Sequence, residues 1–205
     1  MSLLAKSVAV NSFALKNNVN RVTDRLTSKN PQVITLSTLR EMCRSLVRDD
    51  QLDESEVDGL SEIIASFYDM LSAERDELGR VDVSRRKEIR NTSLVDSAVM
   101  MHGYAGLMRN YMSDMGSMGT QLAKSYWKER LNRLSCVHRY ETWSGDLFEK
   151  INPLWLAQGV VKPNSAGTSI SQVNNGATRA TTARVLTAII RSDSVPDDLR
   201  NLALR

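Results

Sequence analysis

Apolar residues recur three and four positions apart through most of this 205-residue chain, and this helical period constrains its fold more than any other feature. The clearest run opens at Asp53 and Glu56, which have the spacing of a capping box. Apolar side chains then keep heptad-like spacing from Val57 to Leu78, and Gly79 is placed to end the helix. Because the chain holds only four prolines, long helices can run without a break.

Similar patterns predict helices elsewhere, so we expect an all-α fold, an irregular bundle of about six to eight helices. A second capping box at Thr38 and Glu41 is expected to start one helix, and Ser84 to cap a long helix whose apolar stripe reaches Met112. Gly103 and Gly106 on that helix indicate close approach of another helix. The remaining helices are expected within residues 3–15, 19–28, 120–140 and 171–191, with a short last turn after 194.

Residues 141–170 lack a helical period and are expected to form a non-helical arm. A chain of this length can bury a core of its own, so we expect one helical domain over residues 1–205. The glycine-containing segment 116–120 reads as a hinge and marks a possible subdivision.

Composition argues against secretion and against a membrane span. Cys43 and Cys136 are isolated and form no disulfide framework, which favours a reduced, cytoplasmic protein. No apolar run approaches the length of a membrane helix. Six of the nine methionines lie between Met100 and Met118, where core packing is the favoured role and an adaptable binding surface is the alternative.

The sequence shows no recognisable catalytic, phosphate-loop or metal-ligand motif, so we expect neither catalysis nor a bound cofactor or metal. His102 is expected to pack within its helix. Cys136, His138 and Glu141 contain the residue types of a nucleophile–base pair. However, positions i and i+2 of the helix expected there face apart, which argues against such a pair.

Charge is strongly segregated along the chain although the net charge is only +3. Residues 49–82 carry twelve acidic and two basic side chains, whereas the flanking regions are basic. Such segregation can form a positive face for a polyanion, or the acidic helix can pair with its basic neighbours inside the fold.

Two basic clusters are candidate phosphate contacts, although a solvated helix face is the more common meaning of such a cluster. The first lies at an expected helix start and the second is interleaved with Tyr126 and Trp127. The candidate nucleic-acid-binding residues are Arg85, Arg86, Lys87, Arg90, Lys124, Lys128, Arg130 and Arg133.

Three stretches resemble DndB-like proteins, also called DGQHR-domain proteins, of DNA phosphorothioate modification systems. They are "NRVTDRLTSKNPQVITLSTLREMCRSLV", "SYWKERLNRLSCVHRYETWSGDLFEK" and "GVVKPNSAGTSIS", and the resemblance covers most of residues 15–190. The family's Asp-Gly-Gln-His-Arg pentapeptide is absent, since Leu60 follows Asp58 and Gly59. The chain therefore looks like a C-terminal helical portion, and an activity attributed to the pentapeptide is not carried over.

The resemblance implies a non-catalytic regulator that binds promoter DNA and represses a modification operon. Duplex DNA is then the expected partner. The alternative is a helical interaction domain that binds a protein partner or a second copy of itself without touching DNA.

Overall fold

Eight α-helices make up most of the described part of the chain, and three short two-stranded sheets accompany them. The computed structural model describes residues 2–27, 29–47, 52–166 and 169–203. The α-helices are α1 (Ser2–Asn11), α2 (Leu36–Leu46), α3 (Glu54–Glu74), α4 (Val83–Thr92), α5 (Ala98–Met118), α6 (Thr120–Leu131), α7 (Pro153–Ala157) and α8 (Gly176–Arg191). The strands are β1 (Val19–Asn20), β2 (Ile34–Thr35), β3 (Val137–Tyr140), β4 (Trp143–Asp146), β5 (Val161–Pro163) and β6 (Ile170–Gln172). Single 3₁₀ turns span Asp76–Leu78, Asn132–Ser135 and Leu199–Asn201. The fold is thus mostly helical, and the all-α prediction is correct only in part.

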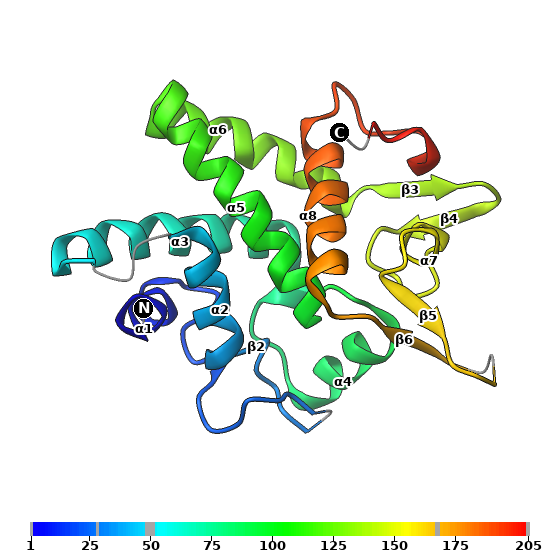
Figure 1. The fold of residues 1–205 in the computed structure, drawn as a ribbon, viewed down its shortest axis with the longest axis horizontal. Coiled ribbons are helices and arrows are strands. Elements are labelled where there is room, and N and C mark those ends of the chain that lie inside the picture. The colour runs from blue at the N-terminus through cyan, green and yellow to red at the C-terminus, as the bar shows by residue number, and fades with distance from the viewer. Residues whose placement is uncertain (1, 28, 48–51, 167–168, 204–205) are drawn as a thin grey trace.

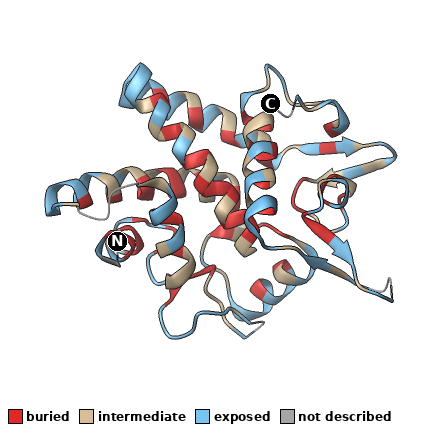
Figure 2. Ribbon diagram, viewed as in Figure 1, coloured by how far each residue is buried: buried red, intermediate tan, exposed pale blue. Residues whose placement is uncertain are grey.

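Helix α5 lies at the centre of the molecule and contacts α2, α3, α6 and α8 (Figure 1). Its buried side chains include Met100, Met101, Tyr104 and Met108, and buried residues follow it along most of its length (Figure 2). These three methionines pack in the core as predicted, whereas Met112 and Met115 are half-buried and Met118 is exposed.

Two glycines let α8 lie directly against α5. A Cβ atom added at Gly103 would lie 2.6 Å from Cγ2 of Thr182, and one added at Gly106 would lie 2.5 Å from Cβ of Ala183. Only glycine leaves room for this approach, so the predicted close helix contact is confirmed and its partner is α8.

Aromatic rings close the junction of α3, α5 and α6. The ring centroids of Phe67 and Trp127 each lie less than 6 Å from that of Tyr111, at 5.5 and 5.9 Å. The indole N–H of Trp127 donates to Asp114 at 2.8 Å, and Arg191 of α8 donates to the same carboxylate. On α6, Trp127 is buried whereas Leu122 is 61% exposed.

The predicted capping box of α3 is confirmed, whereas that of α2 is displaced. Asp53 accepts from the amide of Glu56, and Glu56 accepts from that of Asp53. Helix α2 is capped by Thr35, which accepts from the amide of Thr38 at 3.1 Å. Pairing of β2 with β1 holds Thr35 in an extended conformation, so the helix begins directly after the strand. Glu41 is thereby left in the middle of α2.

The helix expected at 19–28 is wrong. Val19 and Asn20 form β1, which pairs in parallel with β2, and the described residues after it are irregular. Val22 is 93% exposed, so it contributes nothing to the core. Tertiary contacts override the local pattern here, because Arg90 of α4 donates to the carbonyl of Thr27 and also to that of Asn30 just after this segment.

Two other predicted helices end early. The long helix expected from Ser84 is broken after Thr92, and Ser97 caps a new helix, α5. The helix expected over 120–140 ends at Leu131, and β3 then pairs antiparallel with β4. The arm near 141–170 is non-helical as predicted, apart from the five residues of α7, and it contains β4 and β5.

Among the described helices, none combines the length and the apolar character needed to cross a bilayer.

Candidate nucleic-acid interface

The first predicted basic cluster divides into buried and exposed side chains. Arg86 is fully buried, and its guanidinium donates to the carbonyl oxygens of Pro31 and Gly79 at 3.0 and 2.8 Å. It also donates to the buried carboxylate of Asp96 at 3.3 Å. In this fold Arg86 has no surface to offer a phosphate, so it acts as a structural residue and is left out of the interface.

Arg90 shares this structural role. Its Nε donates to Asp96 at 3.2 Å, and its terminal nitrogens donate to the carbonyls of Asn30 and Gln32 at 2.7 and 2.5 Å. Arg85 and Lys87 are exposed on the surface of α4. Arg85 forms an ion pair with Glu88 of the same helix, at 2.8 Å. Exposed pairs of this kind are weak because solvent screens them, so a phosphate can compete for Arg85.

The second predicted cluster also divides. Arg130 and Arg133 cover the C-terminal end of α8, where both donate to the carbonyl of Ile190 at 3.2 Å. Cationic groups are favoured there, because the last carbonyls of a helix lack partners within the helix. Arg130 also lies over the ring of Tyr126, 4.5 Å from the centroid. These two arginines therefore hold α6 and the turn after it against α8.

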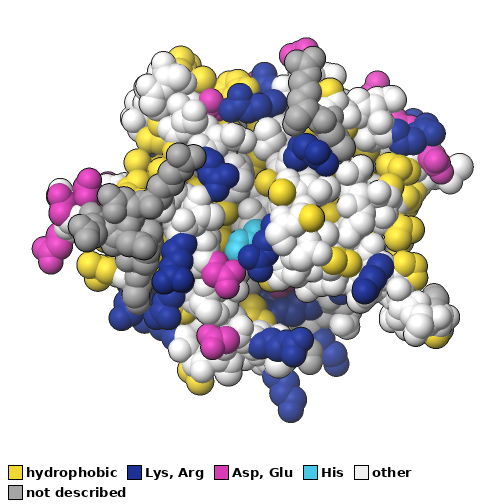
Figure 3. Space-filling model, in the orientation of Figure 1, with side chains coloured by type: hydrophobic (Ala, Val, Ile, Leu, Met, Phe, Trp, Pro, Cys, Tyr) yellow, Lys and Arg dark blue, Asp and Glu magenta, His cyan; other side chains and the backbone are white. Residues whose placement is uncertain are grey.

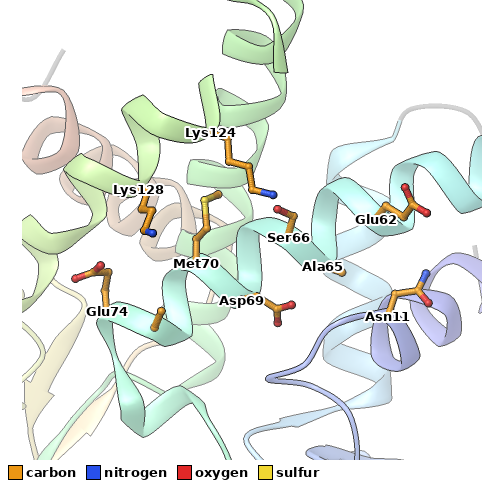
Figure 4. A pocket seen from close by; sticks show the side chains of 10 residues that line it. Asn11, Glu62, Ala65, Ser66, Asp69, Met70, Glu74, Lys124 and Lys128 are labelled. Atoms are coloured by element: carbon orange, nitrogen blue, oxygen red, sulfur yellow. The ribbon is translucent and has the colours of Figure 1, made fainter. Parts of the chain in front are cut away.

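Lys124 and Lys128 point from α6 into a groove above the acidic helix α3 (Figure 4). The groove has a volume of about 500 Å³, and its other charged lining residues are Glu62, Asp69 and Glu74. Carboxylates thus outnumber the two lysines. A polyanion is disfavoured here because like charges would face it.

A different cleft gathers positive charge, above α5 and between α2 and α8. It has a volume of about 550 Å³ and lies within the face shown in Figure 3, where a histidine has acidic and basic side chains beside it. Its lining residues are Glu41, Arg44 and Ser45 from α2, His102, Gly106 and Arg109 from α5, and Arg179, Ala180 and Ala183 from α8. Three guanidinium groups face one carboxylate, so the cleft has an excess of positive charge.

Two of the three arginines are positioned by neighbours. Arg109 donates to the carbonyl of Ser45 at 2.6 Å, at the C-terminal end of α2. Arg179 lies 3.3 Å from the carboxylate of Glu41. Arg44 is exposed, and none of the described carboxylates forms an ion pair with it. Arg44 is therefore the readiest contact for an incoming anion.

Glu41 supplies the one carboxylate among the described residues that line the cleft. Its carboxylate oxygen lies 3.3 Å from Nε2 of His102 as well as from Arg179. Burial lowers the pKa of His102 below its ordinary value, and nearby Arg179 acts in the same direction, while Glu41 opposes them. His102 is thus mainly neutral near pH 7, and the positive charge of the cleft comes from the arginines.

The other residues considered for chemistry lie apart from this cleft. His138 is fully buried in β3, where Nε2 lies 2.9 Å from the carbonyl of Arg133, and Cys136 is half-buried before that strand. Within the described residues, no group of three or more His, Cys, Asp and Glu side chains is arranged to hold a metal ion.

The family model named DndB, described as DNA-sulfur modification-associated, matches residues 1–190. The chain belongs to the DndB family. The resemblance found in the sequence is thus confirmed, and the match also includes α1. Membership associates the chain with DNA phosphorothioate modification. No curated protein and no solved structure matches it.

Sequence patterns could not reveal the cleft of this DndB-family chain. Arg44, Arg109 and Arg179 are separated by more than sixty positions from one another, and the packing of α2 and α8 on α5 brings them together. One signal was available in Gly103 and Gly106, which indicated where another helix would approach α5. The charges of that second helix could then have been added to those of α5.

Proposed function

We propose that the chain is a DNA-binding regulatory component of a DNA phosphorothioate modification system, with a binding role and no catalytic one. In this proposal it represses its modification operon by holding promoter DNA. The observation that carries the proposal is the convergence of three guanidinium groups on one open cleft. Arginine is well suited to phosphate because its planar donors match the phosphate oxygens.

The geometry favours contact with the DNA backbone. The arginines come from three helices and line an open depression, and each helix contributes one arginine to it. Contacts of this kind give affinity and orientation without reading sequence. Exposed Arg85 and Lys87 on α4 are proposed as additional phosphate contacts away from the cleft, where they would extend the path of the duplex.

Binding of duplex DNA, measured by fluorescence anisotropy over a series of salt concentrations, tests the proposal. Arg44→Ala is the cleanest variant, because none of the described contacts depends on this side chain. We expect weaker binding to every duplex sequence and a salt slope reduced by about one unit. Arg139→Ala is the matched control, since Arg139 is an exposed arginine of β3 outside the cleft.

The remaining cationic sites are ranked by the same assay. We expect the double variant with Arg85→Ala and Lys87→Ala to bind DNA more weakly. Lys124→Ala and Lys128→Ala should leave DNA affinity unchanged, because carboxylates of α3 face those two lysines. Equal, unaltered affinities in the Arg44, Arg109 and Arg179 variants, with the helical circular dichroism spectrum intact, would contradict a DNA site at the cleft.

A protein-binding role is the second candidate, and the groove between α3 and α6 favours it. The groove combines both signs of charge with an apolar floor of Ala65, Met70 and Ala73. A polypeptide segment carrying apolar and charged side chains suits such a lining better than a nucleic acid does. Light scattering at rising protein concentration tests self-association, and Met70→Lys should weaken it if this groove is the contact.

A further inference from the structure

The cleft above α5 has two chemically different walls. Arginine side chains reach it from all three helices, while the part formed by α8 and the floor also presents small apolar groups. Ala180 and Ala183 line it from α8, and Gly106 lines it from α5. The small size of these residues is enforced, because a Cβ atom at Gly106 would lie 2.5 Å from Cβ of Ala183. Hydrogen-bond donors and methyl groups are thus offered to one ligand.

A phosphorothioate linkage in DNA matches this division. One non-bridging oxygen is replaced by sulfur, while the linkage keeps its single negative charge and its other non-bridging oxygen. Sulfur is larger than oxygen and a weaker hydrogen-bond acceptor. Moving sulfur from water into contact with methyl groups therefore costs less free energy than moving oxygen there. Burying a polar atom is costly because it gives up hydrogen bonds to water, and sulfur has weaker ones to give up.

We propose that the cleft binds the phosphorothioate linkage of DNA in preference to the ordinary phosphodiester. The sulfur lies against the methyl groups of Ala180 and Ala183, and the non-bridging oxygen accepts from the guanidinium groups. This inference rests on the proposed DNA-binding function and adds the chemical identity of the linkage that the cleft prefers.

The proposal requires stereochemical discrimination. Sulfur substitution makes the phosphorus atom a stereocentre, so the two diastereomers direct sulfur to opposite sides of the backbone. With the duplex in one orientation, one diastereomer places sulfur at the alanine wall and the other places it among the arginines. A cleft lined by arginines alone would favour oxygen on every side and would show no preference for sulfur.

The test compares three duplexes of one sequence: unmodified, with a single Rp phosphorothioate, and with a single Sp phosphorothioate. Anisotropy competition is measured at fixed salt with the whole chain. We expect one diastereomer to bind about fourfold more tightly than the unmodified duplex, the factor that corresponds to moving a group of methylene size into an apolar contact. The other diastereomer should bind no more tightly than the unmodified duplex.

Ala180→Ser tests the wall itself, because Ala180 is exposed and a hydroxyl there should be tolerated by the fold. We expect it to reduce the ratio of the affinities for the sulfur-containing and the unmodified duplex, because the hydroxyl replaces part of the apolar wall by a polar one. Ala177→Ser is the matched control, an exposed alanine of the same helix that does not line the cleft.

The outcomes separate this inference from the function on which it rests. If all three duplexes bind equally and binding still depends on Arg44, DNA binding stands and the preference for sulfur is refuted. A preference that survives unchanged in both Ala180→Ser and Ala183→Ser places the sulfur elsewhere and also refutes the inference. If no duplex binds at any salt concentration, the proposed function fails and the inference fails with it.

Discussion

Two adjacent basic residues of α4 have different roles, because one points into the core and the other into solvent. Arg86 is fully buried with Asp96 and three backbone carbonyls, whereas Lys87 is exposed. Both are basic residues of one charged run, so composition alone does not distinguish them. The helical period does distinguish them, because Arg86 lies three residues before buried Ile89. Its acidic partner, Asp96, lies beyond the helix and is not indicated by that period.

Replacing Arg86 should destabilise the fold severely. Arg86→Ala leaves the carboxylate of Asp96 buried with one fewer partner, and breaking a buried ion pair of this kind costs about 3–5 kcal/mol. Arg90 also contacts Asp96, so we expect the lower part of that range. Urea unfolding measures the change, with Lys87→Ala as the control that should stay within about 0.5 kcal/mol of the parent. Equal stability of the two variants would contradict a structural role for Arg86.

Glu41 is the residue whose removal should improve binding of an anion. Its carboxylate lies beside Arg179 and His102, so in the proposed complex it would compete with a phosphate for the same donors. Glu41→Gln keeps the size of the side chain and removes its charge. We expect DNA affinity to rise several-fold at low salt, and the gain to shrink as salt increases, because the effect is electrostatic. Glu62→Gln, a change of equal charge in the α3 groove, should give a smaller effect. An affinity lowered or unaltered by Glu41→Gln would show that Glu41 does not compete with the ligand.

At the scale of elements, the contact between α5 and α8 depends on small side chains that leave no room for an added methyl group. Gly106→Ala inserts a methyl group where Ala183 already lies, and overpacking of this kind typically costs about 1–3 kcal/mol. Gly116→Ala is a matched control on the same helix, because a Cβ there has no neighbour within 4 Å. It should stabilise the protein by about 0.5–1 kcal/mol through helix propensity.

Thermal or urea unfolding of these two variants should therefore move in opposite directions. Ala183→Gly combined with Gly106→Ala should recover part of the loss, since it removes the atom that the new methyl group meets. If Gly106→Ala and Gly116→Ala both lowered the stability, the loss at Gly106 could not be assigned to its close contact with Ala183.

The helices could be predicted from the sequence where local signals and tertiary contacts agree. The box formed by Asp53 and Glu56 starts α3, and the apolar stripe from Val57 onward is its buried face. The prediction failed at 19–28, where apolar spacing is helical but β1 pairs with β2 and a distant arginine binds the backbone. It also failed at Glu41, because a strand fixed the start of α2 three residues earlier than Thr38. The candidate site could not be predicted correctly for the same reason. The partner of Arg86, Asp96, and the convergence of Arg44 with Arg179 both depend on contacts between segments that are distant in the sequence.

At the scale of the whole molecule, charge segregation along the chain becomes two separate surfaces. The acidic helix α3 and the lysines Lys124 and Lys128 line opposite sides of one groove, so positive charge there faces carboxylates. The cleft above α5 keeps an excess of positive charge, although its arginines are scattered along the chain. The net charge of +3 therefore describes neither surface.

Stability of the whole fold should depend on pH in a window set by two histidines. His102 and His138 are the only histidines in the sequence, and burial lowers the pKa of each below its ordinary value. Around His102 the charged neighbours are Glu41 and Arg179, and around His138 they are Asp146 and Arg75. As the pH falls below about 6.5, the unfolded chain takes up these protons before the folded chain does.

The free energy of unfolding should accordingly be greatest above about pH 6.5 and should fall as the pH is lowered toward the pKa values of the folded state. Each unit by which a histidine pKa is lowered contributes at most about 1.4 kcal/mol to the loss. Urea unfolding at pH 7.5 and 5.5 measures it, and most carboxylates remain ionised across this range. His102→Gln and His138→Gln should each flatten the pH dependence, even if the substitution at buried His138 lowers stability at both pH values. A parent protein equally stable at the two pH values would mean that neither imidazole is desolvated in the fold, and the neutral His102 assigned to the cleft would have to be replaced by a charged one.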